Sequence, residues 1–470
     1  MICVHWIVNK ELRMRYILGG CLTIKKEGFT KQICIGSDET LIAVSDWKEK
    51  HGLDIKRIYF TEYTLPHLGT LFPHIQDIKL YECFAYLDRV FFASLTHLRK
   101  LSLNCCRIAV SKETVDKLLL TNIEDLQLSR MWRIYYNDVN LIRYNSKQSE
   151  VYLWIAKCCP KVKVCSISNC SVSYTTITQM MQQWPLLKEW ELEINDFDLF
   201  AWNGGLDVLN QQVSTMRKAN LESIALDGSY YEHDENAKYF LDILLNCCNV
   251  TELRSLVLYI SDWPEEYSQR LLQSIPNMHQ MKHLTLKGSS NLTFPAFVDA
   301  VLNHCHALES LQLLCSSDSA KDLMLFQAIT ATPNHFHLAH LTSLHLEEMK
   351  LTNESIDILC NSVYAKQLTS LCLKGLCGVS FEAYQQVFTS FNQFQSFELV
   401  LDSRTIFTDE MLEKEEYKQL VSLLDTLFDN NCAFANTLQS LTVDDLYLNH
   451  SKWIDERFKD EMLQDHVIPH

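Results

Sequence analysis

Cysteine and histidine are the residue types in this sequence that could bind a metal ion or act as a nucleophile. Cys165 and Cys170, and likewise Cys372 and Cys377, are separated by four residues, so each pair could supply two zinc ligands. A structural zinc site needs four ligands converging at about 2.0–2.3 Å. Spacing alone leaves metal binding and structural packing as alternatives, so the choice depends on the elements that carry these cysteines.

Histidines gather at His335, His337, His340 and His345. A metal site or a proton switch built from this cluster would need at least three imidazoles on one side. Alternation along a strand would place His335 and His337 together, whereas His345 should face the open surface of its own strand. Because nothing brings three of them together, we predict a surface role for these histidines.

A Cys–His nucleophile pair could be drawn from Cys305 and its neighbours His304 and His306. Adjacent residues in a strand or helix do not normally face each other, and no third group orients the base. The carboxylates are numerous but scattered, so no acid–base pair stands out. We therefore predict no catalytic residues, no metal and no cofactor, and a protein that is not an enzyme.

The elements that position these residues follow from a repeated pattern, apolar-x-x-apolar-x-apolar. It matches fourteen times, from Ile55/Ile58/Phe60 to Leu438/Leu441/Val443, mostly 20 to 34 residues apart. The last two apolar residues of each match share one face of a short strand, and the residues beside them point to the other face. Helix-like stretches such as Thr176–Trp184 and Glu354–Val363 lie between the strands.

Such short units cannot bury their apolar faces alone, but stacking them buries the faces together. We therefore predict an α/β leucine-rich repeat solenoid (horseshoe), with a curved parallel sheet on the concave side and helices on the convex side. A doubly wound sheet also alternates strand and helix, but its strands would be more continuously apolar. In the solenoid Cys165 packs in the core, which favours structural cysteines over zinc.

The segment Cys159–Cys170 resembles the cysteine-containing leucine-rich repeats of F-box proteins, and Leu98–Cys106 and His304–Leu313 are weaker copies. The resemblance implies that the repeats recognise proteins, and that an F-box docks on the adaptor of a cullin ubiquitin ligase. Residues 1–45 lack a Leu-Pro start and an amphipathic helix trio, and Cys21–Ile24 and Gln32–Ile35 are predicted strands. The F-box is therefore either missing from this chain or has diverged.

Three regions are predicted on this basis. Residues 1–45 form an N-terminal cap or a degenerate or truncated F-box, and residues 46–448 form the solenoid, with insertions near 129–152 and 402–416. Residues 449–470 are a polar C-terminal cap or tail. The predicted function is non-enzymatic protein binding as a substrate-recognition subunit of a cullin ubiquitin ligase. The alternative is a scaffold, or an enzyme inhibitor of the ribonuclease-inhibitor type, although that family has more regular repeat lengths.

Composition limits the partners and the compartment. The chain has 470 residues, 47% of them hydrophobic, and a formal net charge of −16, which disfavours nucleic-acid binding. No run of about 18 apolar residues predicts a membrane span. Charged residues among the first twenty interrupt any signal-peptide core, so the 18 cysteines indicate reduced thiols of a cytoplasmic or nuclear protein.

The outward strand positions are the predicted binding surface. The candidate partner-binding residues on this concave face are Arg57, Lys79, Lys100, Glu189, Glu191, Glu193 and Asp227. Glu189, Glu191 and Glu193 alternate along one strand, so they indicate either an ordinary solvated face or an acidic patch for a Lys/Arg-rich partner segment. In the first insertion Trp132, Tyr135 and Tyr136 either contact a partner or fold back onto the solenoid.

Overall fold

The computed structural model of this chain describes residues 20–26, 29–35, 52–56, 59–60, 75–81, 84–86, 95–110, 120–130, 133–136, 148–196, 218–227, 240–260, 265–288, 300–301, 303–315, 338–347, 351–375, 379–401, 437 and 439–445. These residues belong to two compact units. The first unit comprises Met1–Gly228 with Asp242–Asn249, and the second comprises Ser229–Leu241 with Val250–His470.

In the first unit, parallel strands pair in the order in which they occur in the chain. They are β3 (Gly52–Lys56), β5 (Asp77–Tyr81), β7 (Lys100–Asn104), β9 (Asp125–Ser129), β11 (Val164–Ser171), β12 (Glu189–Asp196) and β13 (Ser223–Asp227). At one end β1 (Gly20–Lys26) runs antiparallel to β3 and forms a hairpin with β2 (Phe29–Ile35). The strands predicted at Cys21–Ile24 and Gln32–Ile35 lie within this hairpin.

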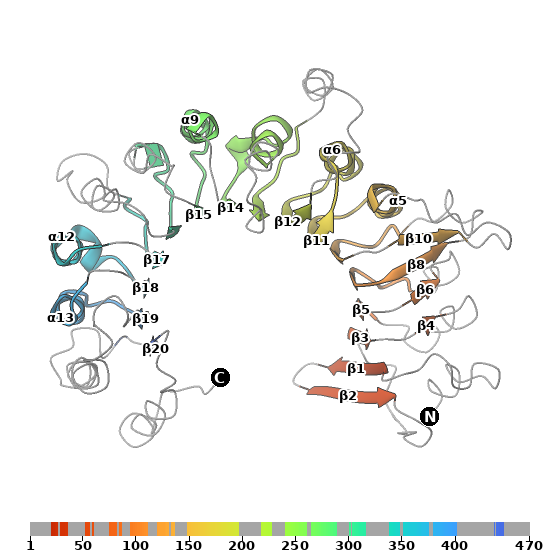
Figure 1. Ribbon diagram of the computed structural model, residues 1–470, viewed down its shortest axis with the longest axis horizontal. Coiled ribbons are helices and arrows are strands. Elements are labelled where there is room, and N and C mark those ends of the chain that lie inside the picture. The colour runs from red at the N-terminus through yellow and green to blue at the C-terminus, as the bar shows by residue number, and fades with distance from the viewer. Residues whose placement is uncertain are drawn as a thin grey trace. The chain divides into compact units, whose positions relative to one another are not determined.

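The outer layer of the first unit changes from strands to helices along the chain. Four short strands form a second parallel sheet: β4 (Tyr59–Phe60), β6 (Phe84–Tyr86), β8 (Arg107–Val110) and β10 (Arg133–Tyr136). Later repeats carry α5 (Gln148–Cys158), α6 (Tyr174–Gln183) and a π-helical turn, η4 (Ile243–Cys247). Figure 1 shows β4, β6, β8 and β10 side by side on one side of the longer sheet. The helices predicted for this layer occur in the later repeats, and the short strands of these four repeats are an addition that the sequence pattern did not predict.

The second unit repeats the same order of parallel strands. They are β14 (Ser255–Ile260), β15 (His283–Gly288), β16 (Ser310–Cys315), β17 (Ser343–Glu347), β18 (Ser370–Lys374), β19 (Ser396–Leu401) and β20 (Ser440–Asp445). The described helices are α9 (Glu265–Ser274), α12 (Asn353–Asn361) and α13 (Phe381–Ser390), with the short 3-10 turns η5 (Val250–Glu252), η6 (Ile275–Asn277) and η7 (Val363–Lys366). Figure 1 shows α12 and α13 on one side of β17, β18 and β19.

The repeated apolar residues form the core, as predicted. In the triplet Ile123/Leu126/Leu128 no side chain is more than 2% exposed. Thirteen of the fourteen triplets place their last two residues at matching positions of the parallel strands, as in the pair Leu284 and Leu311 of β15 and β16. Full burial of each leucine contributes about 1.5–3 kcal/mol.

The first triplet is assigned wrongly by the sequence pattern. β3 aligns Leu53 with Ile78 and Ile55 with Leu80, whereas Phe60 lies in β4 of the outer sheet and pairs with Ala85. Leu53 and Ile55 match only the last two positions of the template, because Lys50 stands at its first position, and the pattern therefore selected the complete match five residues later. Arg57, which was predicted to face outward from this strand, follows the end of β3 and lies outside the described residues.

A backbone ladder at the strand entry fixes the register. The carbonyl of Glu124 accepts hydrogen bonds from the N–H groups of Lys163 and Val164, at 2.7 and 3.0 Å. In the second unit the carbonyl of Glu309 accepts from Thr342 and Ser343, at 2.9 and 3.1 Å. One carbonyl therefore positions the start of the next strand, which also satisfies backbone groups that would otherwise lack partners.

Left-handed residues occur at the opposite ends of several strands. Cys105, Arg130, Asn169 and Gly375 have φ angles of 53°, 48°, 53° and 61°. The Cys105 amide donates to the Ser129 carbonyl at 2.9 Å, and the Gly375 amide donates to the Val400 carbonyl at 2.7 Å. The reversed backbone turns the chain out of the sheet and keeps one more hydrogen bond to the neighbouring repeat.

Each unit is therefore a leucine-rich repeat solenoid. From β3 onward, the parallel strands of the long sheet pair in the order in which they occur in the chain, and this order does not reverse within either unit. A doubly wound sheet would contain such a reversal. In the parts of the chain that the structure describes, no helix has both the length and the apolar character needed to cross a bilayer.

Candidate functional site

The outward side chains of the long sheet form what we call the strand face. Because side chains alternate along a strand, three outward positions per strand line up with those of the neighbouring strands. In the second unit the first of these rows contains Ser310, Ser343, Ser370, Ser396 and Ser440. The second and third rows of that unit carry larger polar side chains.

In the first unit, the early strands present mixed charges. The Lys100 ammonium lies 3.0 Å from Oδ2 of Asp125 on the next strand, and this ion-paired hydrogen bond raises the pKa of Lys100. A small pocket beside the pair is lined by Asp77, Lys79, Lys100, Leu101, Ser102, Asp125 and Gln127. Two of the predicted basic residues, Lys79 and Lys100, therefore share their surroundings with two aspartates.

The acidic strip consists of Glu189, Glu191 and Glu193 on β12 with Asp227 on β13. Glu189 and Glu191 are exposed, whereas Glu193 is half-buried and aligns with Asp227 across the strands. Trp190 and Leu192 alternate with the glutamates and are buried in the core. The sheet therefore holds the predicted carboxylates on one face.

The pKa of Glu193 is raised by its position in the acidic strip. Partial burial raises the pKa of Glu193 most, and the nearby carboxylates of Asp227 and Glu191 raise it further. Arg130 and a hydrogen bond from Asn169 act in the opposite direction. Both residues have left-handed backbones: Arg130 directly follows β9, and Asn169 lies in β11 where its register with β12 shifts, so these two irregular positions help to hold the acidic strip.

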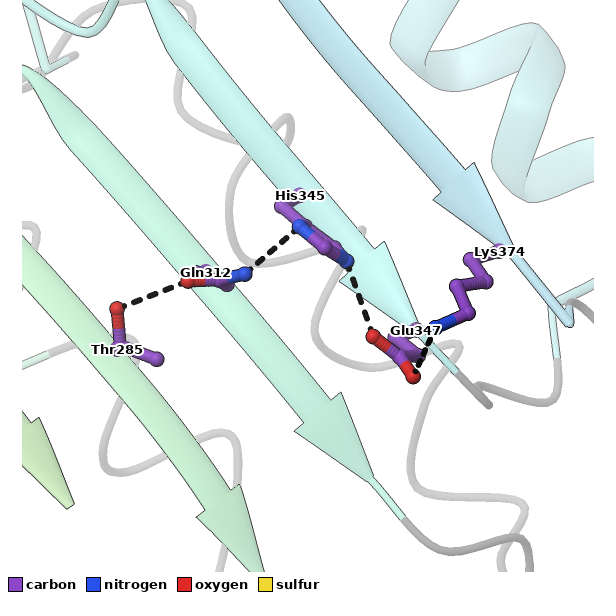
Figure 2. Close-up of polar contacts among 5 residues, drawn as sticks. All are labelled: Thr285, Gln312, His345, Glu347 and Lys374. Carbon is purple, nitrogen blue, oxygen red and sulfur yellow. Dashed lines mark hydrogen bonds and ion pairs between the residues drawn. The ribbon is translucent and has the colours of Figure 1, made fainter. Parts of the chain in front are cut away.

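In the second unit, five side chains from four strands form a continuous polar chain (Figure 2). Thr285 Oγ1 donates to Gln312 Oε1 at 3.1 Å, and Gln312 Nε2 lies 2.7 Å from His345 Nδ1. His345 Nε2 lies 3.2 Å from Oε2 of Glu347, whose Oε1 lies 2.9 Å from Lys374 Nζ. We call this group the polar chain.

Next to the polar chain, Cys372 occupies an outward position but is buried. Burial, followed by the neighbouring Glu398 and Glu347 carboxylates, raises the pKa of Cys372 to about 12. This thiol is therefore protonated at neutral pH and lacks the reactivity of a thiolate.

Cys165 and Cys305, the other cysteines considered for chemistry, are buried in the core. Cys165 is buried in the core of β11, and among the described residues no three cysteine, histidine or acidic side chains gather to hold a metal ion. Burial raises the pKa of Cys305 to about 12, and its thiol contacts the Met278 carbonyl at 3.8 Å. His304 and His306, its neighbours in sequence, are exposed. His340 is exposed as well, whereas His345 belongs to the polar chain.

Several predicted features lie outside what the structure describes. These are Arg57, Trp132, His335, His337, Cys377, residues 402–416 and residues 449–470. Tyr135 and Tyr136 lie in β10, which pairs with β8 in the outer sheet, although the description does not extend to their side chains. This part of the predicted insertion therefore continues the regular outer layer.

Sequence reasoning missed the polar chain. Gln312 and His345 come from different repeats, 33 residues apart, and their contact follows only when β16 and β17 are aligned. The available signal was the shared repeat position of Thr285, Gln312 and His345. Reading the repeats across the strands, rather than along the chain, would have placed these three polar side chains in one row.

Comparisons with known proteins assign no family to this chain. No family model matches the chain, and no curated protein matches it. Among solved structures, an internalin from Listeria monocytogenes is 15% identical with a TM-score of 0.38, covering 74% of this chain and 86% of that one. The leucine-rich repeat-containing protein LegL7 from Legionella pneumophila is 12% identical with a TM-score of 0.33, covering 80% and 98%. TLR13, solved in a complex with ssRNA13, is 15% identical with a TM-score of 0.34, covering 73% and 54%.

Proposed function

We propose that this chain is a non-enzymatic protein-binding solenoid that holds a partner on its strand face. The observation that carries the proposal is the acidic strip, in which one strand presents Glu189, Glu191 and Glu193 beside Asp227 of the next strand. Burial raises the pKa of Glu193 most, and the carboxylates of Asp227 and Glu191 raise it further, so negative charges lie close together on this strip. A lysine- or arginine-rich segment of a partner would relieve that repulsion and would be steered toward the strip.

The cysteine-containing repeats support a finer proposal, in which the chain selects substrates for a cullin ubiquitin ligase. Their resemblance to the repeats of F-box proteins is the basis for this role. A scaffold, or an inhibitor that wraps a basic enzyme, would use the same strand face without a ligase. A cytoplasmic or nuclear location fits all three roles, because the described cysteines are free thiols.

Charge reversal of the acidic strip tests the binding proposal. The variant carries Glu189→Lys, Glu191→Lys and Glu193→Lys, and a control with the same change in net charge reverses Glu252, Glu266 and Glu354, which are exposed in or beside helices. Proteins captured by the full chain should be lost from the strip variant and kept by the control. Capture at full strength by the strip variant would show that the acidic strip is not the binding surface.

The same capture experiment separates the finer roles. Recovery of a cullin and its adaptor together with the full chain supports the ligase role. Recovery of a basic partner without them supports a scaffold or an inhibitor. Rising salt should weaken capture of the basic partner by the unaltered chain, because contacts between exposed charges are screened over about 8–10 Å.

A further inference from the structure

We propose that His345 is a proton-dependent switch that reverses the hydrogen-bonding direction of the polar chain and so regulates partner binding at the second unit's strand face. The regulatory consequence rests on the proposed function, because it needs a partner on that face. The switch itself is a property of the chain alone. It follows from which atom donates and which accepts at each contact in Figure 2.

The contacts specify one state of the imidazole. Thr285 Oγ1 donates to Gln312 Oε1, so the amide nitrogen of Gln312 is the atom that faces His345 Nδ1, at 2.7 Å. An amide nitrogen has only hydrogens to offer, and Nδ1 must therefore accept. This assigns the neutral tautomer with its hydrogen on Nε2, which donates to Oε2 of Glu347 at 3.2 Å.

A second proton is incompatible with this arrangement. An imidazolium carries hydrogens on both nitrogens, so Nδ1–H would face the amide hydrogens of Gln312 at hydrogen-bonding distance. Rotation of the Gln312 amide by half a turn removes the conflict, because Oε1 then accepts from Nδ1–H. The amide nitrogen then faces Thr285 Oγ1, which must change from donor to acceptor.

The reversal therefore reaches the surface at Thr285. With neutral His345, the hydroxyl hydrogen of Thr285 is committed to Gln312, and only the lone pairs of its oxygen remain for a partner. With protonated His345, the oxygen accepts from Gln312 and the hydroxyl hydrogen becomes free to donate. Thr285, Gln312 and His345 are all half-buried, and the His345 side chain is 23% exposed, so both protons and a partner can reach the row.

Charged groups surround the imidazole on both sides along the sheet. Glu347 is the anion that pairs with His345, and Lys374 of β18 is the nearest cation, bound to the same carboxylate. The next groups on β18 and β19 are the protonated thiol of Cys372 and the carboxylate of Glu398. On β15 the ionisable groups are His283 and Lys287, which are exposed, and Lys287 lies 5.8 Å from the centre of the Tyr259 ring.

The general chemistry of histidine makes the switch relevant to cells. Histidine is the side chain whose ordinary pKa lies closest to neutral pH. Most buried polar groups are fixed as donors or acceptors, whereas a glutamine amide can exchange the two roles by rotation. In the row Thr285–Gln312–His345, the protonation state of the histidine therefore sets the direction of two hydrogen bonds, with no proton passed along the row and no backbone movement.

Nuclear magnetic resonance of the full chain tests the switch in the absence of any partner. Histidine labelled with 15N reports the tautomer, and the His345→Gln variant identifies the His345 signals. At about pH 8 we expect a protonated Nε2 and an unprotonated Nδ1 on His345, and at about pH 5 we expect loss of the unprotonated-nitrogen signal.

Glutamine labelled with 15N reports the second step. The side-chain amide signals of Gln312 should shift with the same midpoint as His345, and the Gln312→Ala variant assigns them. Gln386, whose amide donates to Asp357 at 2.6 Å, is the matched control and should not follow that midpoint. In a Thr285→Val variant, which cannot hold the amide orientation, the Nδ1–H tautomer of His345 should become more populated at about pH 8.

Two results would overturn the switch: a protonated Nδ1 on neutral His345 in the unaltered chain, or a Gln312 amide that does not respond to the His345 titration. Because these measurements contain no partner, their failure is distinct from a failure of the proposed function. If the switch is present but the strand face binds nothing, only the regulatory role is lost.

Discussion

The ammonium of Lys100 lies 3.0 Å from Oδ2 of Asp125, and the two residues are exact partners in the register of β7 and β9. The lysine side chain is 58% exposed, whereas the aspartate side chain is 17% exposed. Oδ1 of Asp125 is shielded from solvent and receives no donor from the described residues. The pair therefore joins a solvent-exposed ammonium to a mostly buried carboxylate, one of whose oxygens has no contact with solvent.

A double-mutant cycle with Lys100→Ala and Asp125→Ala should give a small coupling energy. Exposed ion pairs contribute about 0.2–1 kcal/mol, and salt screens them. Urea-induced unfolding of the four proteins measures this coupling at low and at high salt. A coupling that is unchanged by salt would contradict the assignment of Lys100 as a solvent-exposed partner.

Replacing Trp190 with alanine should destabilise the first unit strongly. Its side chain is 2% exposed and packs edge-on against Trp184, with ring centres 6.3 Å apart. Truncation of a buried tryptophan costs about 3–5 kcal/mol. Glu191→Ala, at the next position of the same strand, removes an exposed side chain and should change the free energy of unfolding by about 0.5 kcal/mol or less. A larger loss from Glu191→Ala than from Trp190→Ala would mean that the strand faces the other way.

Gly375→Ala should destabilise the second unit by about 1–2 kcal/mol, because a β-carbon disfavours the left-handed backbone. The φ angle at this position is 61°. Cys105→Gly is the matched control, because Cys105 adopts the same conformation with a φ angle of 53°. This change should have little effect or a small stabilising one. Thermal unfolding of both variants provides the comparison, and a neutral Gly375→Ala would contradict the strand-end turn.

Glu193→Gln should stabilise the chain at neutral pH. The pKa of Glu193 is raised in the folded state, so the folded state prefers the protonated side chain and stability is lost as pH rises through that pKa. Glutamine avoids this loss. Its advantage should disappear as pH falls below the ordinary glutamate value of about 4.3, where both states are protonated. Unfolding midpoints across this pH range test the sign, and an advantage that grows on acidification would contradict it.

The inner sheet was predictable because its signal is local and repeated. A leucine at each of three fixed positions identifies the strand, its buried side and its neighbours, as at Leu371 and Leu373. The outer strands gave no such signal. Phe84–Tyr86 and Arg107–Val110 are too short to show alternation, and they form only because the inner sheet has already brought them side by side. The first strand was assigned to the wrong frame for another reason: Ile55, Ile58 and Phe60 complete the template, whereas Lys50 breaks the match that ends at Leu53 and Ile55.

The acidic strip could be predicted from the sequence, whereas the polar chain could not. The alternation of Glu189, Glu191 and Glu193 along one strand could be recognised directly in the sequence. The contacts of His345 could not, because they depend on the rotamers of Gln312 and Glu347 and on the register of separate strands. Contacts between side chains of different repeats depend on how the strands are aligned in space. A pattern in one sequence does not give that alignment directly.

The doubly accepting carbonyls at the strand entries have a consequence for how such a chain can diverge. Glu124 and Lys163 are 39 residues apart, and Glu309 and Thr342 are 33 apart, yet each glutamate carbonyl accepts from the later residue of its pair and from the residue after it. Connecting segments can therefore gain or lose residues over generations while the inner ladder keeps its spacing. Insertions and deletions can accumulate in the connecting segments. The sheet tolerates them because each strand is positioned by hydrogen bonds to the preceding strand.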